Sequence, residues 1–407
     1  MSYLIDRLDD YGRGITKLDD KTCFVSNALV GEDVNIEITN IKSKYIEANS
    51  KEVINKSSNR QVPRCPFYLT CGGCNIMHMN YDSQLEFKKN KVEGILHKFA
   101  DIDGVVKDII PSDEFNYRNK VTLKVINNKL GYFKDKSNDL VAIDKCLLVS
   151  NKINEVINKL NSVNLNNIDE VLIRSNYNDE VLLCLIGKNI EKEYYLNHLS
   201  DIDNIVIIDN NDKLIIKGND YIIDKIDGML FKVSVESFFQ VNSIQVKKLY
   251  DKVLEYAKLT GKERVLDLYC GTGTIGMFLS KKAKYFYGIE INESAVKDAN
   301  YNKKLNNINN IEFLCEDANK IKNNYKNIDL VVVDPPRSGL GENAIKTIVD
   351  INPKRIVYVS CDPVTLARDL KILQQNYLIK ELTPVDMFPN TYHIETISVL
   401  CRKTIEK

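Results

Sequence analysis

The feature that most constrains this fold is a regular alternation of short apolar runs and helical runs from about residue 239 onward. Helical runs such as 293–305 and 343–350 separate the apolar ones. This alternation predicts a doubly wound, Rossmann-like parallel sheet with its ligand site at the carboxyl edge of the strands. The predicted strands are 265–268, 285–289, 311–314, 330–333 and 356–359, followed by an antiparallel edge hairpin formed by 379–387 and 394–400.

The preceding part of the chain predicts two smaller domains. Short β-prone runs and turn signals over 1–58 predict an OB-like β-barrel of about five strands, a class that often binds oligonucleotides. A purely structural β module fits the same runs. Residues 59–238 predict a mostly antiparallel α+β domain. Its first helix, over 81–99, is able to pack on the third domain, which we place at 239–407.

Charge and cysteine content narrow the class of protein. Lys and Arg number 56, as do Asp and Glu, so any surface for nucleic acid would have to be local. The sequence lacks an apolar signal-peptide core and a run of about 18 apolar residues, so we expect a cytoplasmic protein without a membrane span. We also expect a monomer, because no heptad pattern is present. Ten cysteines without an export signal favour metal binding or catalysis over disulfides.

Three cysteines form a compact motif early in the second domain. Cys65, Cys71 and Cys74 have C-x5-C-x2-C spacing, and Gly72-Gly73 allows the tight turn that lets their side chains converge. The fourth ligand we predict is Cys146. Four thiolates suit either tetrahedral zinc or a [4Fe-4S] cluster.

A glycine loop follows the first strand of the third domain. Gly271, Gly273 and Gly276 have the G-x-G-x-x-G spacing of dinucleotide folds, and Glu290 ends the next strand, where it would accept a ribose hydroxyl. This pattern alone fits NAD about as well as S-adenosyl-L-methionine.

Three aspartates favour the methyl donor over NAD. Asp267, just before the glycine loop, would repel a pyrophosphate. Asp317, after the third strand, would accept from an adenine amino group, although it also suits a helix cap. Asp334 is held at the sheet edge by the two prolines of the motif DPPR, at 334–337.

The motif SCDP ends the fifth strand and contains a candidate nucleophile. Cys361 precedes Pro363, which fits the first turn of a helix, and a helix N-terminus lowers a thiol pKa. Carbon 5 of uracil is a poor nucleophile, so a thiolate must first add to carbon 6, and a separate base must later remove the carbon 5 proton. We predict Glu395 as that base. Arg368 and His393 are candidates for lowering the thiol pKa.

Two groups of side chains are candidates for contact with a flipped-out, single-stranded RNA. One is a set of lysines on the solvent-exposed face of helix 81–99, and the other combines an aromatic ring with two cations. Each group also fits an ordinary solvated surface. The groups are Lys88, Lys89 and Lys91, and Tyr117, Arg118 and Lys120.

Taken together, these motifs resemble the RNA uracil-5-methyltransferase family, specifically its 23S ribosomal RNA branch with a [4Fe-4S] cluster. The resemblance covers essentially the whole chain, from a TRAM-like N-terminal module to the final HIET. Its marks are CPFYLTCGGC with Cys146, FFQVN at 238–242, the glycine loop, DPPR, SCDPVTLARD and HIET.

The resemblance implies a set of roles for these residues. Cys361 would be the nucleophile and Glu395 the proton acceptor, and the four cysteines would bind the cluster rather than zinc. S-adenosylmethionine would be the cofactor and 23S rRNA the partner, with the uridine unspecified. The cofactor-pocket residues implied are Gln240, Tyr269, Glu290 and Asp334.

Alternative functions remain at this point. A tRNA uridine-5-methyltransferase would use the same chemistry, although by the resemblance the cysteine quartet favours rRNA. A non-catalytic RNA-binding assembly factor would keep RNA affinity without turnover. A radical enzyme fits less well, because C-x5-C-x2-C differs from the expected C-x3-C-x2-C, and an NAD dehydrogenase lacks a recognisable hydride-transfer site.

Overall fold

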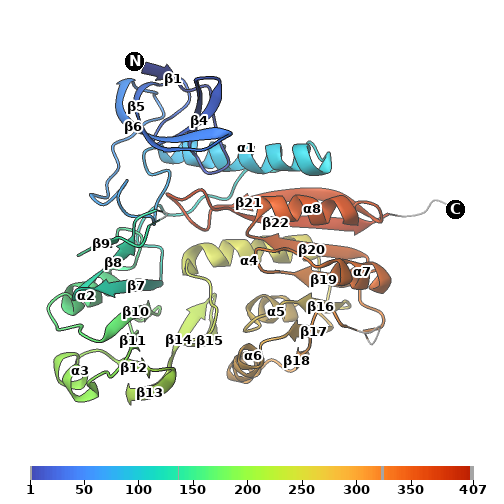
Figure 1. Ribbon diagram of the computed structural model, residues 1–407. Coiled ribbons are helices and arrows are strands. Elements are labelled where there is room, and N and C mark those ends of the chain that lie inside the picture. Colours follow the sequence, from blue (N-terminus) through green and yellow to red (C-terminus); the bar gives the residue numbers. More distant parts are fainter. Residues whose placement is uncertain (1, 136, 322–324, 404–407) are drawn as a thin grey trace.

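The computed structural model describes residues 2–135, 137–321 and 325–403, and begins with a curled β-sheet (Figure 1). The described strands follow the order β1-β5-β6-β4-β3-β2, in which β4 and β6 are parallel. Alternate residues of β4 and β6 face inward, so Cys23, Val25, Ile46 and Ala48 form its core. The strands are β1 (Ser2–Leu4), β2 (Arg7–Leu8), β3 (Gly14–Leu18), β4 (Lys21–Ser26), β5 (Asp33–Ile41) and β6 (Tyr45–Asn55).

Helix α1 (Tyr81–Ala100) lies between this sheet and α8 (Pro363–Leu373) of the C-terminal domain (Figure 1). Its N-cap Asn80 accepts a hydrogen bond from Ser83 N at 2.9 Å. Val92, Ile95 and Leu96 join the core that contains the inner face of α8. No helix among the described residues has both the length and the apolar content to span a bilayer.

The central domain is built on a mixed sheet of seven described strands in the order β13-β12-β11-β10-β7-β8-β9. Its described pairs are antiparallel except β11–β12. This agrees with the predicted mostly antiparallel α+β domain. The elements are β7 (Lys120–Ile126), β8 (Lys129–Phe133), β9 (Leu140–Ala142), α2 (Asn151–Leu160), β10 (Ile168–Ser175), β11 (Val181–Gly187), α3 (Lys192–His198), β12 (Asn204–Asp209) and β13 (Asp212–Lys217).

A hairpin connects the central and C-terminal domains. Strands β14 (Tyr221–Ile226) and β15 (Met229–Ser234) pair only with each other among the described strands. Phe231 and Val233 share one core with Leu182 of the central sheet and Leu249 of α4 (Ser243–Ala257). The hairpin therefore joins the two domains through continuous apolar packing.

The C-terminal sheet has the order β18-β17-β16-β19-β20-β22-β21 in the described part of the chain. The first five are parallel, and β22 runs antiparallel between β20 and β21. Helices cover both faces, as the alternation predicted. The remaining elements are β16 (Arg264–Leu268), α5 (Thr274–Ser280), β17 (Tyr285–Glu290), α6 (Glu293–Leu305), β18 (Ile311–Cys315), β19 (Leu330–Val333), α7 (Glu342–Ile351), β20 (Arg355–Ser360), β21 (Tyr377–Val385) and β22 (Glu395–Arg402).

Candidate active site

Strand register brings the predicted nucleophile and base together. In the antiparallel pair β20–β22, Ser360 lies opposite Thr396. The next residues outward are Cys361 and Glu395, so they leave the sheet at the same edge. The parallel strand β19 ends beside β20 at that edge, where it is followed by Asp334. The site thus combines one thiol and two carboxyl groups.

Local sequence explains the turn that presents Cys361. The Asp362 carboxylate caps α8 by accepting from Val364 N at 2.9 Å and Thr365 N at 3.0 Å. Pro363 occupies the first turn of the helix, where its missing N–H costs no hydrogen bond. Because Ser360 still belongs to the strand, Cys361 lies between a fixed strand end and a fixed helix start.

The predicted lowering of the thiol pKa is wrong for this structure. The pKa of Cys361 is raised to about 12, first by burial and then by the Glu395 and Asp334 carboxylates. Arg337 is the cation that opposes this rise. Arg368 instead binds Asp369 at 2.8 Å. Burial, followed by Arg337 and Lys91, lowers the pKa of His393 to about 4, so it is neutral at pH 7.

The two carboxyl groups have unusual proton affinities. Burial raises the pKa of Asp334 to about 7. Burial and then the nearby Asp334 raise the pKa of Glu395 well above its usual value, whereas Arg337 lowers it. A carboxylate with a raised pKa is a stronger proton acceptor. Asp334, with a pKa close to neutral pH, is therefore suited to accept and release a proton there.

The glycine loop lies at the same edge, between β16 and α5. Gly271 and Gly273 have φ of +54° and +81°, and a Cβ on Gly273 would lie 2.4 Å from Phe313. The Glu290 carboxylate accepts from Gly271 N at 3.1 Å and from Asn292 N at 2.8 Å. Glu290 thus holds the glycine loop in place, and its carboxylate lies where the sequence predicted a contact with a ribose.

Asp267, which the sequence analysis used as an argument against a pyrophosphate, occupies an unusual environment in the structure. Its side chain is fully buried, and neither carboxyl oxygen has a hydrogen-bond partner in the described structure. Burial, followed by Asp334 and Glu290, raises its pKa well above the usual value. A buried carboxyl without a donor is costly, so this environment fits a ligand with a cationic or donor group. The sequence argument rested on its place just before the glycine loop, and it did not predict that the side chain would be buried without a partner.

The other three predicted cofactor residues lie in three different parts of the structure. Asp317 accepts from Asn319 N at 2.9 Å within a turn. No described helix begins there, so the helix cap that the sequence also allowed is not formed in the described structure. Tyr269 has φ of +67° and lines a cavity of about 500 Å³ beside Pro336. Gln240 lies between β15 and α4, where its carbonyl accepts from Asn119 Nδ2 at 3.2 Å. Within the described residues, no hydrogen bond joins Gln240 to the glycine loop.

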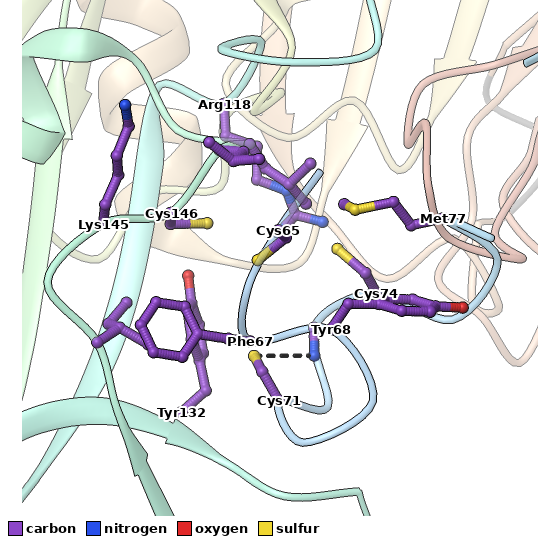
Figure 2. Close-up of a pocket in the computed structure, with 14 residues that line it drawn as sticks. Cys65, Phe67, Tyr68, Cys71, Cys74, Met77, Arg118, Tyr132, Lys145 and Cys146 are labelled. Atoms are coloured by element: carbon purple, nitrogen blue, oxygen red, sulfur yellow. Dashed lines mark hydrogen bonds between the residues drawn. The ribbon is translucent and has the colours of Figure 1, made fainter. Parts of the chain in front are cut away.

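The four predicted metal ligands line one cavity of about 50 Å³ (Figure 2). Figure 2 shows the sulfur atoms of Cys65, Cys71, Cys74 and Cys146 directed toward a common space. Burial raises the pKa of the first three thiols, and the nearby Cys146 raises each further. Among the described residues, no three or more His, Cys, Asp or Glu side chains form a site for a metal ion.

Comparison with known proteins identifies the family. A family model described as tRNA (Uracil-5-)-methyltransferase matches residues 80–403, which is most of the chain. The chain belongs to the tRNA (uracil-5-)-methyltransferase family. A TRAM domain model matches residues 4–50, which confirms the predicted TRAM-type N-terminal module. Membership confirms the prediction of an RNA methyltransferase.

Relatives of this family member cover nearly its whole length. It is 35% identical to an uncharacterised RNA methyltransferase from Staphylococcus aureus strain MSSA476, over 95% of each chain. It is 36% identical to one from Clostridium tetani, over 96% of this chain and 93% of the relative. The solved Pyrococcus abyssi tRNA (uracil-54, C5)-methyltransferase, in complex with S-adenosyl-L-homocysteine, has a TM-score of 0.82 and 29% identity. The match covers 98% of this chain and 99% of that one.

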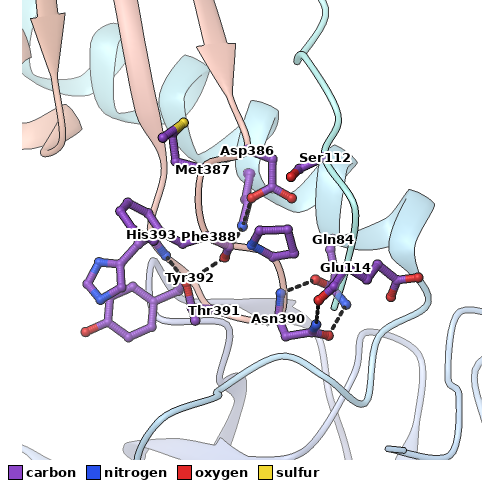
Figure 3. A network of polar contacts seen from close by, with 12 residues as sticks. Gln84, Ser112, Glu114, Asp386, Met387, Phe388, Asn390, Thr391, Tyr392 and His393 are labelled. Atoms are coloured by element: carbon purple, nitrogen blue, oxygen red, sulfur yellow. Dashed lines mark hydrogen bonds and ion pairs between the residues drawn. The ribbon is translucent and has the colours of Figure 1, made fainter. Parts of the chain in front are cut away.

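In this tRNA (uracil-5-)-methyltransferase family member, the segment 386–394 that leads into Glu395 is held by a buried network (Figure 3). Asn390 is fully buried with φ of +67°. Its N donates to Gln84 Oε1 at 2.8 Å, and its carbonyl accepts from Asn75 N at 3.0 Å and Ile76 N at 3.2 Å. The residues that directly follow Cys74, together with α1, therefore support the segment that positions Glu395.

Two sequence expectations about RNA contact are wrong. Tyr117 is buried, and its hydroxyl donates to the carbonyl of Pro389 at 3.1 Å, so it offers no face to a base. Arg118 lines the cysteine cavity instead of an open surface. Lys88, expected on the wet side of α1, is fully buried against Asp386. Gln84 and Lys88 therefore belong to the buried face of α1, together with Val92.

Proposed function

We propose that this protein transfers a methyl group from S-adenosylmethionine to carbon 5 of a uridine in RNA, through a covalent adduct on Cys361. The observation that carries the proposal is the register pairing that places Cys361 and Glu395 side by side at the sheet edge. The chemistry needs a nucleophile and a separate proton acceptor, and this edge offers both.

The residues at the glycine loop fit the methyl donor. The unpartnered, buried Asp267 would accept from its cationic amino group, and Glu290 from its ribose hydroxyls. Gly273 leaves room where a Cβ would clash. Tyr269, Asp317, Asp334 and Gln240 complete the proposed pocket. When bound, S-adenosylmethionine supplies the methyl group.

The residues of this chain would then act in sequence on uracil. The Cys361 thiol loses its proton to a neighbouring carboxylate, and its sulfur adds to carbon 6 of the base. The resulting enolate makes carbon 5 nucleophilic, so carbon 5 takes the methyl group. Glu395 removes the proton from carbon 5, the double bond between carbons 5 and 6 re-forms, and the thiolate leaves. Asp334, with a pKa of about 7, is suited to the first proton transfer.

Replacing Glu395 with glutamine should trap the covalent adduct. The amide keeps the size of the side chain but cannot accept the carbon 5 proton, so elimination of Cys361 stops. We expect a protein–RNA band that survives denaturing electrophoresis and contains the transferred methyl group. Glu155→Gln, on α2 with an exposed side chain, is the control and should give no such band. Normal turnover in Glu395→Gln would assign the proton transfer to another group.

We propose 23S ribosomal RNA as the substrate, with tRNA as the second candidate. By resemblance the cysteine quartet favours ribosomal RNA, whereas the Pyrococcus abyssi relative acts on uracil 54 of tRNA. The deciding experiment incubates the protein with labelled S-adenosylmethionine and unmodified transcripts of each RNA. Mass spectrometry of the fragments then locates 5-methyluridine. No 5-methyluridine in either RNA would refute the proposed function, and binding without turnover would favour an assembly factor.

We further propose that Cys65, Cys71, Cys74 and Cys146 bind a [4Fe-4S] cluster. A single zinc ion draws four thiolates to about 2.3 Å from one point, whereas each thiolate of a cluster binds a different iron, so the sulfurs stay farther apart. Four thiols around one cavity supply the donor set for either arrangement, and the resemblance favours the second. The cluster would tie the 65–74 loop to Cys146.

Replacing Cys71 with serine should remove the cluster. We expect the anaerobically purified protein to absorb near 400 nm and to contain about four irons per chain, and Cys71→Ser to lose both properties. Cys315→Ser is the matched control, since that cysteine is exposed and lies outside the cavity. Zinc in place of iron in the wild-type protein would contradict the assignment.

The domain division into 1–58, 59–238 and 239–407 remains a proposal, as do the monomeric state and the cytoplasmic location. Separate cores support the first boundary, because one core of the described residues ends at Val53. Helix α1 belongs to the second segment but packs on the third, so these two segments would not move independently.

A further inference from the structure

Three aromatic rings from two domains meet beside the proposed active site. We call Tyr11, Tyr392 and His393 the aromatic cluster. Tyr11 lies in the N-terminal TRAM domain, and its ring meets that of Tyr392 edge to face, with 5.1 Å between centroids. The rings of Tyr392 and His393 are 4.4 Å apart. Figure 3 shows these two rings on the opposite side of the 386–394 segment from Asn390 and Gln84.

The aromatic cluster is not fully covered by protein. Tyr11 is 54% exposed, and Tyr392 and His393 are partly exposed. In an edge-to-face pair the two rings are not stacked on each other, so a flat ring face stays available to a third ring. Bases of single-stranded RNA stack on such rings whatever their sequence. The cluster is therefore able to accept an unpaired base.

The aromatic cluster also lies within the electrostatic reach of the proposed active site. The Arg337 guanidinium lowers the pKa of both Cys361 and Glu395, and it acts in the same way on Tyr392 and His393. Tyr392 precedes Glu395 by three positions in the chain. Tyr392 and His393 of the aromatic cluster therefore belong to the segment that ends at Glu395, next to the position proposed for the uridine.

Charges around the aromatic cluster suit a short piece of single strand. Arg337 is exposed and forms no ion pair among the described residues. The Lys91 amino group lies 5.1 Å from the centre of the Tyr392 ring and donates to the Tyr392 carbonyl at 3.1 Å. Burial lowers the pKa of the Lys91 amino group to about 8, and the Asp10, Asp362 and Asp9 carboxylates oppose this fall. The exposed Arg337 is therefore the cation available to a single phosphate, whereas the three carboxylates disfavour a run of phosphates.

We propose that the aromatic cluster stacks the base of a nucleotide flanking the target uridine, so that the TRAM domain and the catalytic domain together hold the single strand. The identity of the target rests on the proposed function, but the stacking does not. The competing interpretation is that the Tyr11–Tyr392 contact only fastens the TRAM domain to the rest of the protein.

The test uses a short oligouridine with one 2-aminopurine next to its central uridine. Stacking on a tyrosine quenches 2-aminopurine fluorescence, so binding and stacking are measured together. We expect Tyr11→Ala and Tyr392→Ala to weaken binding about 10- to 100-fold and to remove the quenching. Tyr392→Phe keeps the aromatic ring and should retain both the affinity and the quenching of the wild-type protein. Tyr301→Ala is the matched control. Tyr301 is an exposed tyrosine of α6 whose ring lies near Tyr221 and Lys232, away from the aromatic cluster. Its replacement should change affinity less than about twofold.

Unchanged affinity and quenching in both alanine variants would overturn the proposal and leave only a contact between domains. A thermal melt of each variant shows that it is folded. With wild-type RNA substrate, Tyr11→Ala should raise KM about 10-fold and leave kcat within about twofold. A wild-type protein that methylates no RNA would refute the proposed function, but the oligouridine measurements would still decide the stacking.

Discussion

Replacing Cys361 with alanine should lower methyl transfer to RNA by about 10⁴-fold or more, because loss of a covalent nucleophile removes the only route to a nucleophilic carbon 5. The variant should still bind RNA and S-adenosylmethionine, because the glycine loop, Asp267 and the aromatic cluster remain. Transfer of label from S-adenosylmethionine to RNA measures the rate, and equilibrium binding measures the retained affinity.

Cys401→Ala is the matched control for this prediction. Cys401 lies on β22, the strand that begins with Glu395, but near its opposite end and away from the sheet edge. We expect it to methylate RNA within about twofold of the wild-type rate, since conservative changes outside the site have small effects. Substantial turnover by Cys361→Ala would show that carbon 5 is activated without a thiolate adduct.

Replacing Lys88 with alanine should lower the free energy of unfolding by about 3–5 kcal/mol, the usual cost of leaving a buried charge without its partner. The Lys88 amino group lies 2.6 Å from the Asp386 carboxylate, and neither side chain is exposed. The same amino group donates to the Phe388 carbonyl at 3.0 Å. Denaturant unfolding monitored by circular dichroism measures the change.

Lys89→Ala is the control on the same helix. Lys89 pairs at 2.8 Å with Asp108, which is 98% exposed, so its loss should cost no more than about 1 kcal/mol. Lys88→Met combined with Asp386→Leu removes both charges and should recover much of the stability lost in Lys88→Ala. Equal losses in the Lys88 and Lys89 variants would show that the buried pair does not stabilise the fold.

The effect of Lys88 should extend to catalysis. Asp386 and Phe388 belong to the segment that leads into Glu395, and Lys88 comes from α1. Because Tyr392 and His393 belong to the same segment, losing its ion pair should also loosen the aromatic cluster.

Much of the fold followed from local pattern. The strand and helix periods of the third domain predicted the parallel sheet, and even the bounds of α6 agree with the predicted run. Single residues with strong backbone preferences were also predictable. Pro363 marks the start of α8, and Gly273 occupies a position that has no room for a side chain.

The sequence by itself therefore determined the fold class, the family and the residue types available for chemistry, because periodicity and short motifs are local properties of the chain. The tertiary structure alone decided which of these residues meet. It buried Lys88 in a stripe that looked solvated, left Asp267 without a partner, and raised the Cys361 pKa where a helix N-terminus suggested the opposite. Burial and charge pairing depend on segments far apart in the chain, and Lys88 and Asp386 are 298 positions apart.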